Sequence, residues 1–298
     1  MGTTGTESQE TKPSGSGQAP RSQGKVVRER LDVLLVERGL APSRERARAL
    51  IMARQVLVDG KAVEKAGTLV PRTAVCELAA KPDELRFVSR GGLKLERALD
   101  MFALDPAGCV CLDVGASTGG FTDVLLKRGA RRVYAVDVGH GQIAWELRID
   151  PRVVVMDRTN IRYLESLPET PDCAVIDVSF ISLRLVLPRV AALLATGGWV
   201  VALVKPQFEA GRAEANRGGG VISDPAVHQR VLSDLLAFIA EQGQLAARGL
   251  TVSPITGRNG NHEYLLWLTV SDATPDAVAI GESELLAVVA TAFAETNR

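Results

Sequence analysis

Hydrophobic residues beyond position 98 are grouped into short apolar runs that alternate with segments of helical periodicity. The runs predict strands near residues 109–114, 132–137, 152–156, 173–178 and 198–204, with helices between them. Strands that alternate with helices form a parallel sheet covered by helices on both faces. Two more strands are expected near residues 247–253 and 263–270, and the short Gly/Asn turn between them makes them antiparallel. The pattern therefore predicts an α/β fold with a mostly parallel sheet and an antiparallel strand near the C-terminus.

The segment from residue 28 to residue 80 has a different pattern. Apolar positions within residues 31–38 are spaced for one face of a short helix, and Ser43 is suited to cap a second helix that continues to Met52. Two apolar runs then surround Asp59 and Gly60, a dipeptide typical of hairpin turns. These elements predict a small α+β unit ahead of the larger fold.

The first residues of the chain are polar and small. Eighteen of residues 1–24 are Gly, Ser, Thr, Gln or Pro, a composition that buries too little apolar surface to offset the entropy lost on ordering. Three parts are therefore expected: a disordered tail (1–25), a small domain (26–84) and a large domain (85–298).

Charge is distributed unevenly between the two halves. Lys plus Arg and Asp plus Glu both total 35, yet residues 1–97 contain 18 basic and 12 acidic side chains, which leaves 17 and 23 for residues 98–298. A basic N-terminal unit attached to an acidic remainder favours a polyanionic partner for the N-terminal unit.

Other compositional features narrow the class of protein. The uncharged stretch from Val190 to Val204 is too short to span a membrane, and no apolar core of a secretory signal follows Met1, which predicts a cytoplasmic protein without a membrane partner. The four cysteines do not suggest a disulfide framework, and Cys109 and Cys111 lie in an apolar run without nearby ligands. No metal site is predicted. His140, His228 and His262 are interpreted as turn residues rather than as catalytic bases.

A glycine-rich turn after the first strand of the α/β region is the clearest candidate for a ligand site. Residues 113–120 read DVGASTGG, and glycines before a helix N-terminus let a ligand approach the backbone and its free N–H groups. Asp137 ends the next strand, where a carboxylate can accept hydrogen bonds from both ribose hydroxyls of a nucleoside cofactor, and Asp157 ends the third, within reach of an adenine amino group. Ser117 replaces the third-position glycine of the dinucleotide fingerprint, and no Walker lysine follows, which disfavours NAD and ATP.

The motif at residues 113–120 resembles the first motif of class I S-adenosylmethionine-dependent methyltransferases. Four further motifs, SRGGLK at 89–94, DVSFIS at 177–182, VKPQFE at 204–209 and NHEY at 261–264, resemble the TlyA family of ribosomal RNA 2′-O-methyltransferases, within the FtsJ-like group. Residues 28–86 resemble the small RNA-binding domain first recognised in a ribosomal protein of the small subunit. The resemblance implies a Rossmann-like class I methyltransferase sheet, preceded by a small α+β RNA-binding domain.

The resemblance also implies a cofactor and its site. S-adenosylmethionine is the expected cofactor, and the residues expected to bind it lie at the ends of the strands and in the glycine-rich turn: Asp113, Gly115, Ser117, Thr118, Gly119, Gly120, Phe121, Asp137, Asp157 and Asp177.

A catalytic tetrad of two lysines, an aspartate and a glutamate is implied at Lys94, Asp177, Lys205 and Glu263. The predicted topology agrees, because Asp177 and Lys205 end parallel strands and Glu263 begins an antiparallel one, which puts all three at one sheet edge. Lys205 is the candidate for direct contact with the ribose 2′-hydroxyl, and Lys94 for holding that hydroxyl or the neighbouring phosphate. Asp177 and Glu263 would orient the lysines. The sequence leaves open which member accepts the proton.

Basic residues in the small domain are the candidate RNA contacts. They lie on and after its second helix and on the hairpin: Arg44, Arg46, Arg48, Arg54 and Lys61. Few aromatic residues accompany them, which favours recognition of shape and phosphate over base stacking. Arg212 and Arg217, in a glycine-rich segment, are expected to add contacts near the reaction centre.

The predicted function is 2′-O-methylation of cytidine in small-subunit or large-subunit ribosomal RNA, or in both. The partners expected are ribosomal RNA or ribosomal subunits, with no stable protein partner. Two alternatives stay open: a haemolysin-type cytolysin, because the family also carries that description, and a noncatalytic ribosome-binding assembly factor.

Overall fold

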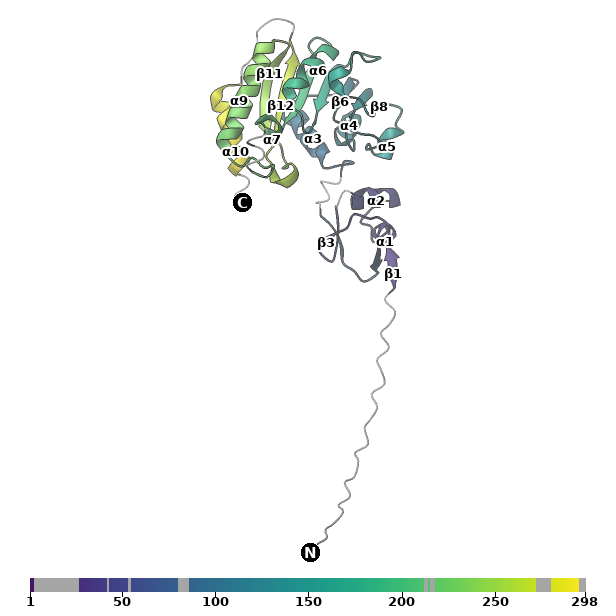
Figure 1. Cartoon of the computed structure of the whole chain (residues 1–298). Coiled ribbons are helices and arrows are strands. Elements are labelled where there is room, and N and C mark those ends of the chain that lie inside the picture. The colour runs from purple at the N-terminus through teal and green to yellow at the C-terminus, as the bar shows by residue number, and fades with distance from the viewer. Residues whose placement is uncertain are drawn as a thin grey trace. The chain divides into compact units, whose positions relative to one another are not determined.

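The computed structural model divides the chain into two compact units, residues Met1–Ala80 and Lys81–Arg298 (Figure 1). The residues it describes are 1–2, 27–41, 43–52, 55–79, 86–211, 214, 218–271 and 280–294. Nearly all of the expected disordered tail falls outside these ranges, as do Arg54, Arg212, Arg217 and the expected domain boundary at residues 84–85.

The N-terminal unit contains two helices and two small antiparallel sheets. In chain order its elements are β1 (Arg28–Arg30), α1 (Leu31–Glu37), α2 (Arg44–Met52), β2 (Val56–Val58), β3 (Lys61–Ala62), β4 (Leu69–Pro71) and β5 (Cys76–Leu78). β1 pairs with β4, and β2 lies between β3 and β5. Both predicted helices and the hairpin at Asp59 and Gly60 are confirmed, with positive φ angles of 49° and 76° at the two turn residues. The strands β1, β4 and β5 were not predicted.

A seven-stranded sheet forms the centre of the second unit. Its strands are β6 (Val110–Val114), β7 (Arg132–Val136), β8 (Val153–Met156), β9 (Cys173–Ile176), β10 (Trp199–Val204), β11 (Leu245–Val252) and β12 (Tyr264–Val270). Their spatial order is β11-β12-β10-β9-β6-β7-β8, and the five strands from β6 to β10 are parallel. β12 is antiparallel to β10 and to β11, so the predicted fold class is confirmed.

Helices cover both faces of this sheet (Figure 1). They are α3 (Gly91–Met101), α4 (Gly120–Lys127), α5 (Trp145–Arg148), α6 (Leu187–Leu193), α7 (Pro206–Glu209), α9 (Pro225–Gln242) and α10 (Glu282–Ala294). Residues of α3, α4 and α5 share one buried apolar cluster, and residues of α6, α9 and α10 share the other. Neighbouring residues of β6 contribute to opposite clusters, as the alternation of side chains along a strand requires.

One connection and the C-terminal segment differ from the predicted pattern. Between β8 and β9 the chain forms only a short 3-10 helix, Ile161–Tyr163, where a helix was expected. Pro168 and Pro171 lie in this connection, and neither can continue a helix, because proline lacks the N–H that a helical hydrogen bond needs. The C-terminal helix α10 was not predicted at all.

Candidate active site

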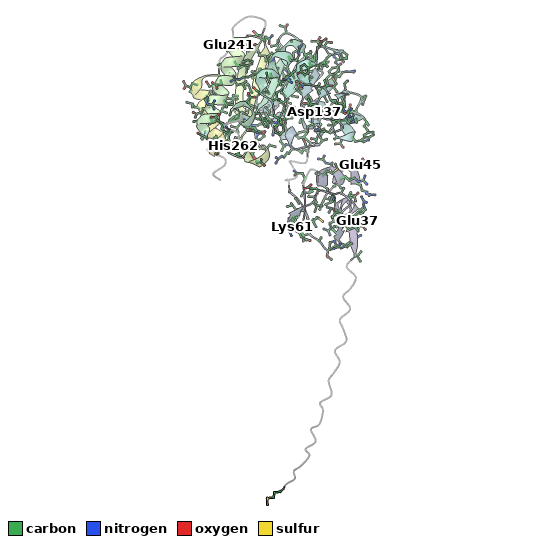
Figure 2. All side chains as sticks on the ribbon, viewed as in Figure 1. Glu37, Glu45, Lys61, Asp137, Glu241 and His262 are labelled. Carbon is green, nitrogen blue, oxygen red and sulfur yellow. The ribbon has the colours of Figure 1, made fainter. Side chains whose placement is uncertain are left out.

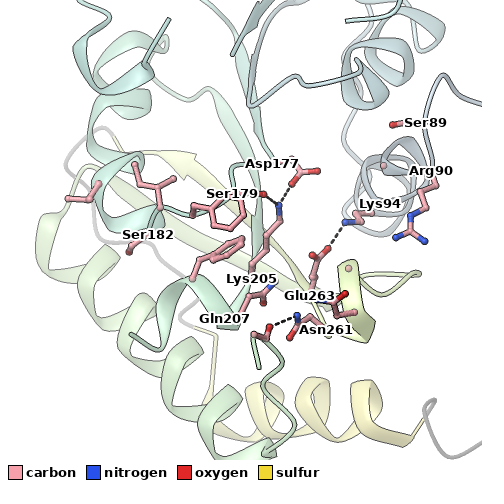
Figure 3. Close-up of a pocket in the computed structure, with 18 of the residues that line it drawn as sticks. Ser89, Arg90, Lys94, Asp177, Ser179, Ser182, Lys205, Gln207, Asn261 and Glu263 are labelled. Carbon is pink, nitrogen blue, oxygen red and sulfur yellow. Dashed lines mark hydrogen bonds and ion pairs between the residues drawn. The ribbon is translucent and has the colours of Figure 1, made fainter. Parts of the chain in front are cut away.

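A pocket of about 1190 Å³ opens at the carboxyl ends of the parallel strands, and all four members of the predicted tetrad line it (Figure 3). Asp177 follows β9 and Lys205 follows β10. Glu263 immediately precedes β12, whose antiparallel direction brings its start to the same edge. Lys94 reaches the pocket from α3. The structure therefore brings together the four side chains that the motifs singled out.

Lys205 forms an ion pair with Asp177 at the pocket wall. The distance from Lys205 Nζ to Asp177 Oδ1 is 2.5 Å, and the same ammonium donates a hydrogen bond of 3.0 Å to the hydroxyl of Ser179. Lys205 is only 8 % exposed, because the six residues of β10 before it are part of the sheet and Pro206 starts a helix directly after it. The lysine is thus held in one place by its strand, its helix and its counter-ion.

The second lysine, Lys94, forms an ion pair with Glu263. Both are buried, and they come from an N-terminal helix of the unit and from the start of β12, 169 residues apart along the chain. Removing one partner of a buried pair leaves an uncompensated charge, which costs about 3–5 kcal/mol in typical proteins. The pocket therefore contains two lysine–carboxylate pairs whose charges are mutually balanced.

The glycine-rich turn packs against the loop that carries Asp177. Gly115 has a φ of +84°, and a Cβ at this position would lie 2.5 Å from the carbonyl oxygen of Asp177. Gly119 has a φ of +93°, and its Cβ would lie 2.3 Å from Leu147. Only glycine suits these two positions, so the turn can approach the reaction centre closely.

Asp113 lies completely buried at the end of β6. Its Oδ2 accepts a hydrogen bond of 2.6 Å from the Thr122 hydroxyl, whereas Oδ1 is buried without a hydrogen-bond partner. Burial disfavours the charged form and raises the pKa of Asp113 to about 7. Asp113 therefore carries one carboxylate oxygen that no group in the described part of the protein satisfies.

The predicted ribose acceptor, Asp137, which is labelled in Figure 2, also bonds to the backbone of the turn. Its two carboxylate oxygens accept hydrogen bonds from the backbone N–H groups of Ser117, at 2.8 Å, and Gly139, at 2.7 Å. A carboxylate has about four acceptor positions, so two remain for a ligand.

Asp157 has more partners within the protein. Its Oδ2 accepts hydrogen bonds from Arg148, at 2.9 Å, and from the Gly141 N–H, at 3.2 Å, and lies 3.2 Å from Nδ1 of His140. The hydrogen bond from Arg148 lowers the pKa of Asp157. These contacts hold the loop after β7 in place.

Among the predicted cofactor residues, Phe121 has a side chain that is buried in the apolar core. It is 3 % exposed and belongs to the apolar cluster under α3 and α4. Ser117 and Thr118, in contrast, are exposed in the turn. Phe121 can therefore contribute only its backbone N–H, in the first turn of α4, to a ligand.

One feature of the pocket was not anticipated from the sequence. Phe180 is 90 % exposed, has a φ of +64°, and lines the pocket with its ring centroid 5.0 Å from that of Phe208. The sequence signals were its position three residues beyond a strand-end aspartate and its place in the DVSFIS motif at 177–182. An exposed aromatic ring with an unusual backbone conformation is a candidate for ligand contact.

The interpretation of His228 as a turn residue is wrong. It is completely buried in α9, with Nδ1 2.8 Å from the Tyr264 hydroxyl and Nε2 2.9 Å from the Ile222 carbonyl oxygen. Burial lowers the pKa of His228 and favours its neutral form. Because α9 begins at Pro225, the helical spacing of the apolar residues after it could have placed His228 on the buried face.

In the N-terminal unit, Arg44 and Arg48 both bond to the carboxylate of Asp32, which the sequence analysis did not single out. Arg46 lies on the same helix, and its backbone N–H donates to Ser43. Lys61 is exposed on β3 (Figure 2). The predicted basic residues that the structure describes therefore belong to one compact unit, and two of them share a buried partner.

The described ranges contain neither a membrane-spanning helix nor a metal-binding cluster. No helix there is both long and apolar enough to cross a membrane. No group of three or more His, Cys, Asp or Glu side chains in those ranges is arranged to hold a metal ion.

Comparisons with known proteins place these features in a family. The sequence profile of the FtsJ-like methyltransferases matches residues 87–270, and that of the S4 domain matches residues 29–76. A Bacillus subtilis protein named as an rRNA methyltransferase, YqxC, is 49 % identical over 88 % of this chain and 93 % of its own length. The 16S/23S rRNA (cytidine-2′-O)-methyltransferase TlyA of Mycobacterium tuberculosis is 47 % identical over 81 % of this chain and 90 % of its own.

A solved structure agrees with these matches. A protein from Streptococcus thermophilus described as a hemolysin superposes with a TM-score of 0.71 at 44 % identity, over 92 % of this chain and 98 % of that one. The matches cover both units and confirm the resemblance that the sequence motifs indicated. This chain belongs to the TlyA family of FtsJ-like methyltransferases, which combine an S4 domain with a methyltransferase domain.

Proposed function

We propose that this protein transfers a methyl group from S-adenosylmethionine to the ribose 2′-hydroxyl of a cytidine in ribosomal RNA. The observation that carries the proposal is the pocket in which Lys94–Glu263 and Lys205–Asp177 lie beside the glycine-rich turn. The M. tuberculosis relative, whose name states this activity, supports the choice of substrate.

The residues around the turn fit the cofactor. Asp137 retains acceptor capacity for ribose hydroxyls, and the buried Oδ1 of Asp113 lacks a partner. The close approach of Gly115 to Asp177 brings the cofactor side of the site next to the tetrad. When bound, S-adenosylmethionine supplies a methyl group on a positively charged sulfur.

The tetrad supports attack by a hydroxyl. In the transfer, the O–C bond would form as the S–C bond of the methyl donor breaks, and the hydroxyl proton would pass to a member of the tetrad or to water. Loss of that proton places negative charge on the 2′-oxygen until the O–C bond is complete. The ammonium groups of Lys205 and Lys94 stabilise this charge, and the pocket needs no reorganisation, since each lysine is already held by a carboxylate. Asp177 and Glu263 therefore act by orienting the lysines and balancing their charge.

Substrate binding is divided between the two units in this proposal. The S4 domain supplies basic side chains for the RNA backbone, whose phosphates dominate the affinity of most RNA-binding proteins. In the pocket, the exposed ring of Phe180 offers a surface on which the base of the target nucleotide can stack.

The test is methyl transfer by the purified full chain. We would incubate it with ribosomal subunits, or with ribosomal RNA transcripts, and with S-adenosylmethionine carrying a labelled methyl group, then digest the RNA and identify the methylated nucleoside by mass spectrometry. The expected product is 2′-O-methylcytidine. Methylation of a base, or of another nucleoside, would overturn the proposed substrate.

Binding and haemolysis assays beside this experiment separate the alternatives. Cofactor binding and RNA binding without any methyl transfer would favour a noncatalytic assembly factor. Lysis of erythrocytes by the purified protein, without methylation of any RNA, would favour the activity that the name of the S. thermophilus protein suggests.

A further inference from the structure

The carboxylate of Asp32, in the first turn of α1, accepts hydrogen bonds from several arginines among the residues described for the N-terminal unit. It is completely buried, and four N–H groups of three arginines donate to it. Arg30 donates twice, from Nε to Oδ1 at 2.9 Å and from Nη2 to Oδ2 at 3.1 Å. Arg44 and Arg48 each donate once to Oδ2, both at 3.1 Å. These bonds lower the pKa of Asp32, so the group remains a carboxylate.

The arginines themselves are not buried with their partner. Their side chains are 43 % (Arg30), 52 % (Arg44) and 49 % (Arg48) exposed. A guanidinium has five N–H donors, so each arginine keeps donors that can face solvent. Three positive charges and one negative charge leave this arginine cluster, defined as Arg30, Arg44 and Arg48, with a net charge of +2.

Two other arginines of the unit, Arg38 and Arg72, bond to partners other than Asp32. Arg38 donates to the backbone carbonyls of Ala74 and Arg72, and Arg72 donates to Glu29 and Glu37. Those contacts tie the ends of elements together. The arginine cluster, in contrast, connects the residue before α1 with one face of α2 and turns positive charge outward around a single buried anion.

We infer that Asp32 is a positioning residue for RNA binding, which holds Arg30, Arg44 and Arg48 as one preformed surface for backbone phosphates. The inference rests on the proposed function, since it takes RNA as the ligand. A long arginine side chain loses rotamer freedom when it binds a phosphate, and a partner that fixes it beforehand removes that cost from the binding step. A guanidinium can also bond to a carboxylate along one edge and to a phosphate along another.

The change in RNA affinity caused by Asp32→Asn distinguishes positioning of the arginines from simple electrostatics, because the two explanations predict changes in opposite directions. Asp32→Asn removes a negative charge beside the arginines, so an account based on charge alone expects tighter binding to RNA. If Asp32 positions the arginines, the opposite should occur. The guanidinium groups lose their common acceptor and RNA affinity falls, although the net charge rises by one. We expect the dissociation constant for RNA to increase at least fivefold.

The measurement is fluorescence anisotropy of a labelled small-subunit ribosomal RNA transcript, titrated with the full-length protein over a series of salt concentrations. Glu45→Gln is the matched control, because Glu45 is an exposed acid on the same helix as Arg44 and Arg48. It should bind RNA as tightly as the wild type or slightly more tightly. Unchanged or tighter binding by Asp32→Asn would overturn the inference.

A second variant covers the case in which Asp32→Asn unfolds the N-terminal unit. Arg44→Lys keeps the charge and leaves Asp32 bonded to Arg30 and Arg48, but the compact ammonium lacks the planar fork of a guanidinium. We expect about threefold weaker RNA binding with an unchanged melting temperature. Wild-type affinity in this variant would overturn the inference.

The proposed function can fail independently of this inference. If the wild-type chain binds ribosomal RNA but transfers no methyl group, the function is wrong, while the comparison of Asp32→Asn with Glu45→Gln still decides the role of Asp32. If methyl transfer occurs and Asp32→Asn binds and methylates as the wild type does, only the inference fails.

Discussion

Lys205 and Glu263 flank the same cross-strand pair. Lys205 directly follows Val204, Glu263 directly precedes Tyr264, and Val204 and Tyr264 are register partners in the antiparallel pairing of β10 with β12. The ladder therefore fixes the spacing of two charged groups that are far apart in sequence. A shift of one residue in this register would turn the side chains to the opposite face of the sheet.

Replacing Lys205 tests its proposed contact with the hydroxyl. Lys205→Ala removes one of the two lysines of the tetrad, and the loss of one stabilising donor typically slows a reaction by about 100-fold or more. Cofactor affinity should stay within about threefold, because Lys205 bonds to Asp177 and Ser179 and not to the glycine-rich turn.

Single-turnover transfer of a labelled methyl group checks this expectation. Lys127→Ala is the control, since Lys127 lies on α4 with a side chain 52 % exposed and does not line the pocket. Near-normal transfer by Lys205→Ala would mean that the tetrad has been assigned to the wrong residues.

The glycine-rich turn depends on Asp137. Asp137→Ala should weaken binding of S-adenosylmethionine at least tenfold, since a hydrogen bond to a charged acceptor contributes about 1.5–3 kcal/mol. The variant also releases the N–H groups of Ser117 and Gly139. Calorimetric titration measures the effect, with Asp234→Ala, an exposed carboxylate of α9, as control. Equal affinities for the two variants would remove Asp137 from the cofactor site.

Much of this site could be predicted from the sequence because strand ends are easy to recognise. Asp113, Asp137, Asp177 and Lys205 each lie in or directly after an apolar run, and parallel strands bring their carboxyl ends to one edge. The order of the strands in the sheet, and hence the position of β12 beside β10, is not contained in that pattern. The family resemblance, rather than periodicity, identified Glu263 and Lys94.

What the sequence did not indicate depends on tertiary contacts. Asp32 looks like an ordinary acidic residue in the first turn of a helix, and only the folded unit brings Arg30, Arg44 and Arg48 to it. Three-residue strands such as β1 are too short to produce a period of two. The burial of His228 follows from packing against Tyr264, which lies 36 residues further along the chain.

Asp113 makes stability depend on pH. In the folded protein its pKa is about 7, against 3.8 for an exposed aspartate, so the folded chain keeps a proton that the unfolded chain releases between these values. Wild-type stability therefore falls as pH rises through this window, by up to ~4 kcal/mol from this group. The side chain introduced by Asp113→Asn is neutral at every pH, so this variant does not lose that stability as the pH rises.

Urea unfolding of the cofactor-free protein at several pH values between about 4 and 8 tests this. The free energy of unfolding of Asp113→Asn, relative to the wild type, should increase with pH. A difference that stays constant over the whole range would show that Asp113 is ionised in the folded state.

Replacing Phe180 should weaken the use of RNA as a substrate without lowering the stability of the protein. Its ring is 90 % exposed, so Phe180→Ala should change the free energy of unfolding by no more than about 0.5 kcal/mol. Stacking of a base on an aromatic ring contributes about 1–3 kcal/mol, so kcat/KM for RNA should fall roughly tenfold or more. Leu185→Ala, another exposed apolar residue of the pocket, is the control, and Phe180→Tyr should retain activity. Normal kinetics for Phe180→Ala would exclude the stacking role.

The two units are expected to have different binding functions: RNA for the first and the cofactor for the second. A chain that begins near Leu85 should fold and bind S-adenosylmethionine but lose most of its affinity for ribosomal RNA. The second unit has its own sheet and two apolar clusters, which supports independent folding. The charges agree with a loss of affinity: residues 1–84 contain 14 basic and 11 acidic side chains, whereas residues 85–298 contain 21 and 24 and are net negative.

Salt dependence provides the decisive measurement for this truncation. Each phosphate neutralised by a protein makes log K fall with log salt at a slope of about −0.7 to −0.9, so the full-length protein should show a much steeper slope than the shortened one. RNA titrations of both proteins at several salt concentrations give the slopes, and cofactor titration verifies that the shortened chain is folded. Equal affinities and equal slopes would contradict the assignment of the S4 domain as the RNA anchor. The contacts would then have to come from the second unit, where Arg90 and Arg162 line the pocket that holds the tetrad.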